Sequence, residues 1–505
     1  DALIAQNPQA QLIKDAIANN TSSSNLEHSS FDSKQFSSPR IQFVDDSGAG
    51  SMPRIIELKM DNGMKVLLVP DDTASKVHLS SVYSVGSNQD PIPGTAHALE
   101  HIAGGGAASS SFKKGEMTDL YEYHGAKAES DYNAGTCGDF TFYWASLDPS
   151  LLELMMKVES ERMDQLDLND IDDVLKREKS LINSEIDMIN DRTGHLIANA
   201  MKDLTIPNSI ANNNVIGTKE SVASIDKQKL QDFYQYYKDP SNLTLVVSGK
   251  IGSPQRLEHL LLNYFANKEK PAQVKPKPID ILKRPSQSPP AKDREQTILK
   301  AGDSKALALA YRGPNYTEKD CFVMSFILEA LSKRGPKSRL VKKLTEAKKI
   351  NIGLDCSPLP SKGDSLNLII VHVDKIVDLD ELKAEVKKVL AEVKANGLDE
   401  DELRKIKQEF LYEQIHKQED ANAQASQAME YDQYGDWHSA ANATKIAQGI
   451  TNDDIKRVAN AVLVDDNEYT VYLKPTEKKE EKKAPAILDK ALDVKELEVK
   501  RLEAL

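Results

Sequence analysis

A proline-rich stretch near the middle of the chain restricts its fold more than any other feature. Prolines recur from Pro271 to Pro290 within residues 270–296, and they include a Pro-Pro pair at the end. Such a segment is extended and semi-rigid, because proline fixes its own φ and donates no backbone hydrogen bond. The sequence therefore predicts a linker over 270–296, between a first domain at 52–269 and a second at 297–475.

The first half begins with a strong β-hairpin signal. The apolar stretches 55–60 and 65–69 flank Asp61-Asn62-Gly63-Met64, and an Asn-Gly pair between two such runs is typical of a tight hairpin turn. Further strands are expected over 77–85, within 131–146 and over 243–248, and helices over 118–123, 149–163, 172–193 and 195–202. Segregated strands and helices with antiparallel hairpins indicate the α+β class.

The second half repeats a similar order of elements. Strands are expected over 306–311, 351–356, 366–373 and 468–473, with helices over 319–333 and 338–346 and a long helix pair across 379–429. The order suggests an internal duplication with a period of about 230 residues. We therefore expect two similar α+β domains.

Both ends of the chain differ in composition from the two halves. Residues 1–51 are expected to be a largely disordered lead, with a propeptide or a partner-binding arm as the alternative. The sequence opens at Asp1 without an initiator methionine or an apolar signal core, which suggests that a segment was removed. This favours an exported (periplasmic or secreted) or organellar protein. Residues 476–505 are expected to be a charged tether and tail.

Charge and cysteine content narrow the possible functions. The net charge of −13 argues against a nucleic-acid partner and against binding to an anionic membrane surface. No apolar run approaches the roughly 18 residues that span a bilayer. Cys137, Cys321 and Cys356 are far apart and have neither metal-site spacing nor a disulfide pattern. For Cys137 a buried thiol is a better interpretation than a nucleophile.

The pattern His97-Ala98-Leu99-Glu100-His101 is the strongest indication of function. Two histidines four residues apart share one face of a helix, so both imidazoles can bind one metal ion. From its position between them Glu100 can reach a water at the metal and accept its proton. The alternative is a surface helix with two exposed histidines beside an acid.

A third ligand is expected from the helix at 172–193. Glu178 and Glu185 lie seven residues apart and therefore on one helix face. Two carboxylates on such a face are usually only solvated. Beside an incomplete two-histidine site, one is expected to bind the metal and the other to orient a ligand histidine through its second nitrogen.

These motifs together resemble the inverted zinc motif of the pitrilysin/insulinase metallopeptidases, a group that includes the mitochondrial processing peptidases. The stretches Asn133–Tyr143 and Tyr236–Leu243 resemble two further segments of that family, and the resemblance runs from about Ile55 to about Leu473. It implies two domains of similar fold and a zinc-dependent endopeptidase that cleaves peptides or unfolded segments in a closed chamber. A catalytically silent partner subunit of a processing-peptidase-like complex is the alternative.

The resemblance also implies roles for individual residues. One Zn²⁺ ion would be bound by His97, His101 and Glu185, while Glu178 would support a ligand and Glu100 would activate the water. A peptide would pair with the strand at Asn133 and Ala134.

Two departures from the family pattern matter. The gap from His101 to Glu185 is 84 positions (185 minus 101), longer than expected, and the small residues of 104–111 suggest an inserted mobile loop at the cleft or a plain solvent loop. Thr345 and Ile352 stand where many relatives carry a substrate-binding arginine and tyrosine. We therefore expect a second two-domain unit to supply that pair, either as a separate subunit or as the C-terminal half of a longer chain. The thirty residues after the last expected strand would suit a linker and favour the second arrangement.

Overall fold

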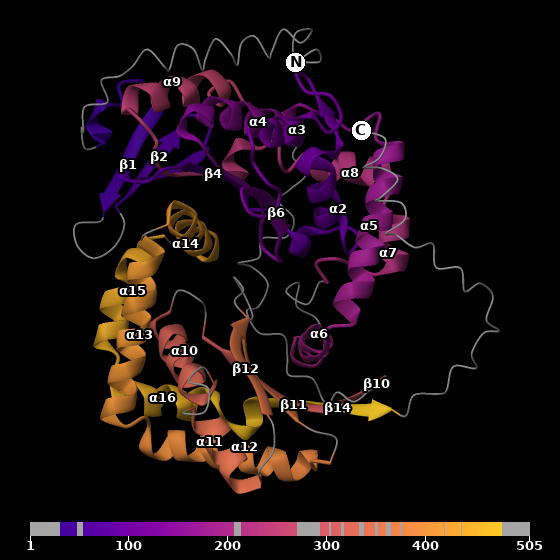
Figure 1. The fold of residues 1–505 in the computed structure, drawn as a ribbon, viewed down its shortest axis with the longest axis vertical. Helices are drawn as coiled ribbons and strands as arrows, with labels where there is room; N and C mark the ends of the chain where they lie inside the picture. The colour runs from indigo at the N-terminus through magenta and orange to yellow at the C-terminus, as the bar shows by residue number, and fades with distance from the viewer. Residues whose placement is uncertain are drawn as a thin grey trace, which may run out of the picture.

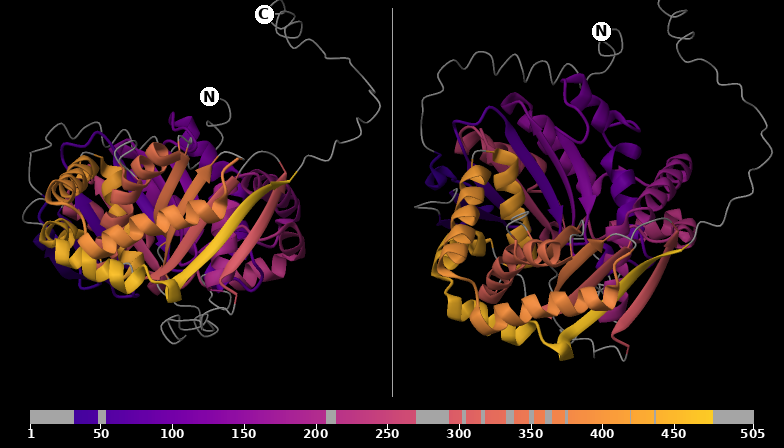
Figure 2. Two further views of the ribbon diagram at one scale, coloured as in Figure 1. Left: turned by 90° about the horizontal axis from the view of Figure 1, so that it is seen from below. Right: turned by 60° about the horizontal axis from the view of Figure 1, so that its bottom comes forward.

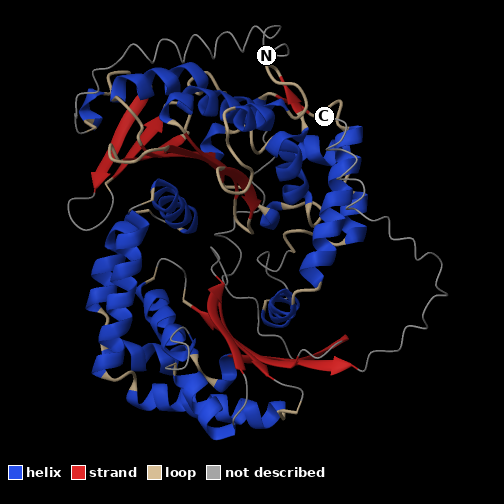
Figure 3. Ribbon diagram, viewed as in Figure 1, coloured by secondary structure: helices blue, strands red, loops and turns tan. Residues whose placement is uncertain are grey.

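The computed structural model describes residues 31–47, 54–206, 214–269 and 293–476, the last range with gaps at 302–304, 315–317, 333–337, 349–351, 360–364, 374–375, 419 and 436. Most of its strands gather into two separate sheets, each with helices around it (Figure 3). Most of the predicted linker and the predicted tail, at 270–292 and 477–505, lie outside the described residues.

The first sheet has seven strands in the order β1-β2-β3-β9-β4-β7-β6. Their bounds are β1 Ile41–Ser47, β2 Ile55–Met60, β3 Lys65–Pro70, β4 Val77–Tyr83, β6 Tyr132–Thr136, β7 Thr141–Leu147 and β9 Leu243–Gly249. The predicted hairpin is confirmed, since β2 and β3 pair antiparallel and Gly63 adopts the positive φ of +97° in the turn between them. One edge of this sheet is β6.

The second sheet has five strands in the order β10-β14-β11-β13-β12. Their bounds are β10 Glu295–Ala301, β11 Lys305–Gly313, β12 Ile352–Leu359, β13 Ser365–Val373 and β14 Glu468–Thr476. β10 begins inside the predicted linker and was not expected as a strand. Figure 2 shows the yellow β14 running alongside β10, with which it pairs in parallel.

The expected duplication is confirmed by the topology of the two sheets. In both, a parallel pair of strands is followed by three antiparallel pairings, through β3-β9-β4-β7-β6 in the first sheet and β10-β14-β11-β13-β12 in the second. Each order places the last strand of its half in the sheet interior, between strands from the beginning of that half. The fold class is thus α+β, as two similar sheet-and-helix units.

The helices occupy similar positions relative to the strands in the two halves. In the first half they are α2 Thr95–His101, α3 Glu116–Tyr123, α4 Leu152–Asp164, α5 Asp172–Asn190, α6 Thr193–Thr205, α7 Lys219–Ser224, α8 Lys227–Tyr234 and α9 Pro254–Tyr264. In the second they are α10 Lys319–Ser332, α11 Arg339–Lys348, α12 Leu379–Asn396, α13 Glu400–Gln418, α14 Ala421–Tyr434, α15 His438–Gly449 and α16 Asn452–Val462. The long helix pair that we expected across 379–429 is wrong, because this region is divided into three helices at breaks near 397 and 419.

The two halves exchange one helix each, which the predicted domain boundaries do not anticipate. α14 from the second half packs on β9, β4 and β3 of the first sheet, and α6 from the first half packs on β14, β11 and β10 of the second (Figure 1). Trp437, at the turn after α14, is buried and donates from Nε1 to Glu57 Oε2 at 2.6 Å. His438 pairs with Asp45 at 2.8 Å. Each half therefore completes the core of the other.

Part of the expected disordered lead is ordered. Phe31 is buried in the first core, and β1 pairs with β2 from Ile41↔Met60 to Ser47↔Ile55. Our expectation for residues 1–51 was wrong over 31–47, because β1 covers the backbone hydrogen-bonding edge that β2 would otherwise expose. Residues 1–30 lie outside the described residues.

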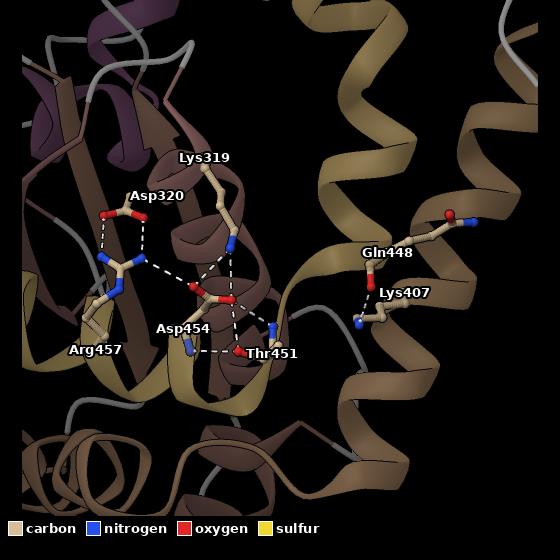
Figure 4. A network of polar contacts seen from close by, with 7 residues as sticks. All are labelled: Lys319, Asp320, Lys407, Gln448, Thr451, Asp454 and Arg457. Atoms are coloured by element: carbon tan, nitrogen blue, oxygen red, sulfur yellow. Dashed lines mark hydrogen bonds and ion pairs between the residues drawn. The ribbon is translucent and has the colours of Figure 1, made fainter.

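A polar network fixes the start of α16 against α10 (Figure 4). Thr451 and Asp454 form a capping box at the helix N-terminus. Asp454 also accepts from Lys319 at 3.0 Å, while Arg457 forms a bidentate pair with Asp320 at 2.6 and 2.7 Å. The network thus connects α10 and α16 at the surface of the second half.

No helix in the described part of the chain is long and apolar enough to cross a membrane.

Candidate metal centre

Helix α2 carries the two histidines. It begins after Gly94, whose φ is +93°, and Asp90 accepts hydrogen bonds from the backbone N–H groups of Gly94 and Ala96 at 2.8 Å each. Burial raises the pKa of Asp90 to about 8 despite these hydrogen bonds. Because Ala98 and Leu99 point into the core, His97 and His101 are left on the opposite face of the helix, as their spacing predicts.

Helix α5 lies beside α2 and brings a carboxylate to both imidazoles (Figure 1). His97 Nε2 is 3.6 Å from Glu185 Oε2, and His101 Nε2 is 3.7 Å from Glu185 Oε1. One potential ligand atom from each of the three residues lies within 4.8 Å of the others. The structure thus brings together three side chains that the sequence predicted to converge, and among the described residues they form the only such group.

Glu178 contacts this group through His101. Its Oε2 accepts from His101 Nδ1 at 3.1 Å, and its Oε1 accepts from Arg177 Nε at 2.9 Å. Burial by itself would raise the pKa of Glu178, but the hydrogen bonds from His101 and Arg177 lower it below the ordinary value. The contact fixes the His101 ring so that Nε2 faces Glu185.

The two imidazoles titrate in opposite directions. Burial and the neighbouring His101 lower the pKa of His97 to about 4. Burial opposes the charged form of His101 as well, but the hydrogen bond to Glu178 and the nearby Glu185 carboxylate raise its pKa to about 10. The carboxylates therefore concentrate negative charge around His101, which is the field that a cation requires.

Glu100 faces the same space and is 9% exposed. Its Oε2 accepts from the Thr136 hydroxyl at 2.7 Å. Burial raises the pKa of Glu100 to about 7, although the Thr136 hydrogen bond opposes this shift. A carboxylate with a pKa near neutrality is suited to accept and return a proton.

These residues line a cavity of about 770 Å³. One wall is the edge strand β6, from which Asn133 and Ala134 contribute to the lining, and another is formed by residues of α6. Asn133 is exposed and Ala134 half-buried. In the described sheet β6 pairs only with β7, so its other edge can accept a further strand.

The segment after α2 is not the loop that we expected. Residues 102–106 continue as a π-helical turn, and β5 (Ala108–Ser109) pairs with β8 (Leu166–Asp167). Arg162 is buried, forms an ion pair with Glu159, and donates from Nε to the Ala103 carbonyl at 3.0 Å. The expectation of a mobile or solvent loop over 104–111 is therefore wrong over 104–106, which are helical, and over 108–109, which pair with β8.

Sequence reasoning missed several residues that contact the site. Thr136 lies in a stretch that had been singled out, but nothing in its spacing indicated a contact to Glu100. Arg177 was also missed, although its position directly before Glu178 was a signal that could have indicated the pair. Nothing in the sequence indicated that α6 forms a wall of the cavity, because that arrangement depends on tertiary packing. Cys137 is confirmed as a half-buried thiol whose pKa burial raises to about 11, which disfavours a nucleophilic role.

The second half offers no equivalent site in its described part. Helix α10, which follows β11 as α2 follows the matching strand β4 in the first half, contains no histidine. Thr345 lies on α11 and donates its hydroxyl to the Val341 carbonyl at 2.5 Å. Ile352 opens the edge strand β12, so a threonine and an isoleucine occupy the positions where an arginine and a tyrosine were considered.

Comparison with protein families places both halves in one group. Residues 65–214 match the family described as insulinase (peptidase family M16), and residues 224–410 match the one described as peptidase M16 inactive domain. The group of three potential metal ligands lies in the first match. The described residues of the second contain none.

Individual relatives are distant and match this chain only in part. An uncharacterized zinc protease, YmxG of Bacillus subtilis, is 23% identical over 38% of this chain and 45% of its own length. A probable zinc protease, PqqL of Escherichia coli, is 26% identical over 40% of this chain and 22% of its own. The matched region thus spans less than half the length of these curated relatives.

Solved structures share the fold over most of the chain. A protease from Helicobacter pylori aligns with a TM-score of 0.75 at 21% identity, covering 84% of this chain and all of that one. The first half of the periplasmic protease PqqL from Escherichia coli aligns with a TM-score of 0.67 at 18% identity, covering 85% and 94%. In a second structure, which contains a longer PqqL chain, the match covers 48% of that chain.

Proposed function

Since this chain belongs to the pitrilysin/insulinase family of metallopeptidases, peptidase family M16, we propose that it is a zinc-dependent endopeptidase acting on peptides or unfolded polypeptide segments. The observation that carries the proposal is the convergence of His97, His101 and Glu185 beside the buried Glu100 in one cavity. Zinc at such a site is also consistent with the names of its relatives.

The three side chains fit a zinc ion. Two imidazole nitrogens and one carboxylate oxygen form the donor set of catalytic zinc sites, which keep one position open. Ligand bonds of about 2.0–2.1 Å in a tetrahedron put neighbouring ligand atoms about 3.3 Å apart. The contacts of 3.6 and 3.7 Å from Glu185 to the two imidazoles are close to that value. A zinc ion held there would supply Lewis-acid polarisation of water and of a peptide carbonyl.

The protein's own groups account for the remaining steps. Glu100 would accept a proton from water at its carboxylate and later donate it to the leaving amine, while Thr136 holds that carboxylate in place. Glu178 would keep His101 in the orientation that presents Nε2. An extended peptide would pair with the free edge of β6 at Asn133 and Ala134, which would align its backbone with Glu100.

A catalytically silent partner subunit is the second candidate. The description of the family matched by the second half, an inactive domain, favours it for that half. The first half retains every residue that the mechanism uses, and this favours an active enzyme.

Zinc content and chelation test the proposed function directly. The purified chain should contain about one zinc per chain, and it should cleave an internally quenched unstructured peptide. Removing the metal with a chelator should stop cleavage, and adding zinc should restore it, because three ligands hold the ion reversibly. Elemental analysis with a fluorescence assay gives both readings. A chain that binds no zinc at neutral pH would support the silent-subunit alternative instead.

We further propose that a second two-domain unit completes the chamber. This chain resembles the first half of PqqL and covers only about half of the longer chain, and it lacks the arginine and tyrosine at Thr345 and Ile352. A peptide held on one wall loses the orientation on which hydrolysis depends. The second unit would be a separate subunit or the C-terminal half of a longer protein.

The chain measured alone should therefore bind zinc but turn over peptides slowly. Chain recovered with its associated proteins through an affinity tag should cleave the same peptide at least about 10-fold faster per bound zinc, because the completed chamber orients the substrate. Size-exclusion chromatography with light scattering identifies the species in each assay. Efficient cleavage by a verified monomer would contradict this part of the proposal.

The names of the relatives also support a proposal about the cellular location of this protein. PqqL is described as periplasmic, and a stromal processing peptidase of Pisum sativum, 23% identical over 40% of this chain, as chloroplastic. We propose that this protein is likewise exported or organellar, and fractionation of the source cells tests this.

A further inference from the structure

Helix α6 has two faces with different surroundings. Its apolar face, formed by Ile197, Met201 and Leu204 at helical spacing, is buried against the second sheet (Figure 1). Residues on the other side of the helix line the cavity, among them Asn199 and Lys202. Because the buried face anchors the helix, the cavity face is a fixed wall.

Lys202 is unusual among the charged residues of this cavity. The cavity is also lined by Arg162, but that guanidinium is already neutralised by its ion pair with Glu159. Within the described chain, by contrast, the ammonium group of Lys202 forms neither a hydrogen bond nor an ion pair, although the residue is half-buried. An ammonium group that is partly removed from water without a partner favours binding of an anion.

Two carboxylates affect Lys202 electrostatically but form no ion pair with it. Burial lowers the pKa of Lys202, and Asp203 and Asp139 oppose this electrostatically without forming an ion pair with it. Asp139 accepts a hydrogen bond from Asn88 at 3.0 Å. The charge of Lys202 is therefore left to interact with whatever enters the cavity.

Lys202 also lines the same cavity as the proposed reacting groups. Lys202, Glu100 and Glu185 line the same cavity. A group that pairs with Lys202 would thus belong to the part of a peptide near the bond that is cleaved.

Building on the proposed endopeptidase function, we propose that Lys202 is a specificity-determining residue that pairs with a carboxylate of the substrate. The enzyme then prefers peptides that carry an acidic group near the scissile bond. Two sources share this chemistry, an Asp or Glu side chain and the C-terminal carboxylate of a short peptide.

A matched peptide series tests the proposal. Internally quenched peptides carry one glutamate, moved through the positions on each side of the scissile bond, and each has a counterpart with glutamine at that position. A second pair differs only in a free or amidated C-terminus. We expect kcat/KM to favour the acidic member by about 10-fold at one position or at the free C-terminus, which identifies the source of the carboxylate.

Variants then assign the preference to Lys202. Lys202→Gln should reduce the ratio of kcat/KM between the acidic and the neutral peptide to about 1. Lys202→Glu should invert this ratio, and Lys202→Arg should keep most of it. Lys388→Gln is the control, since Lys388 is exposed on α12 and pairs with Glu385. Thermal melting and zinc content, measured for every variant, detect a fold or metal defect.

Binding is measured in parallel, by fluorescence anisotropy of the same peptides on the zinc-loaded Glu100→Gln chain. If the unaltered chain cleaves neither the glutamate nor the glutamine peptides, the proposed function fails, and the anisotropy ratio still decides the role of Lys202. Equal kcat/KM and equal affinity for acidic and neutral members, or a preference that Lys202→Gln leaves unchanged, would overturn the inference.

Discussion

Glu100→Gln is expected to reduce peptide hydrolysis by about 1,000-fold while the chain keeps its zinc. The amide has nearly the shape of the carboxylate and can still accept from the Thr136 hydroxyl, so the cavity should be preserved. What it loses is the ability to take a proton, and general base catalysis contributes about 10²–10⁴-fold to rate. Steady-state hydrolysis of a quenched peptide and zinc per chain are the two measurements.

Glu413→Gln provides the matched control, because Glu413 is exposed on α13 and does not line the cavity. It should leave both the rate and the zinc content unchanged. If Glu100→Gln retained full activity, Glu100 would not be the proton acceptor. If it lost zinc together with activity, the two effects could not be separated, and peptide binding to the zinc-reconstituted variant would be needed to exclude a folding defect.

The second large effect concerns the two glutamates of α5. Glu185→Gln should lower zinc affinity by more than about 100-fold, because Glu185 faces both imidazoles and its loss leaves two ligands. Glu178→Gln should lower it by about 10- to 100-fold, since Glu178 acts through His101. Competition with a fluorescent zinc chelator measures both affinities on one scale.

The ranking of these two variants is the informative result. Both replacements remove one carboxylate from the same helix face, so a purely electrostatic effect would be similar in the two. A larger loss for Glu178→Gln would mean that the metal lies about two helical turns from where we propose it. Circular dichroism of each variant without metal shows whether α5 remains folded.

Much of the local structure was predictable from the sequence, because it depends on short-range spacing. The hairpin at β2–β3 follows from Asp61-Asn62-Gly63-Met64, and the common face of His97 and His101 follows from their separation of four. The repeated order of strands and helices predicted two similar units, and the two sheets have the same topology.

The expectations that were wrong concerned segments whose partners lie far away in the sequence. Residues 31–47 look polar and irregular, yet β1 is fixed by pairing with β2. The glycine-rich segment after α2 looks flexible by composition, yet Arg162, about sixty residues later, holds the Ala103 carbonyl. In both cases long-range hydrogen bonds outweigh local propensity.

By itself, the sequence determined the types of element, their order, and the set of residues able to bind a metal, since each is encoded in spacing along one helix or strand. Only the tertiary structure decided how the cavity is enclosed. Helices α6 and α14 carry no sequence mark of which sheet they cover, and each packs apolar side chains on the sheet of the opposite half. Burial of an apolar face is non-directional, so the sequence requires that the face be covered but does not state by what. That exchange places Lys202 in the same cavity as Glu100 and Glu185.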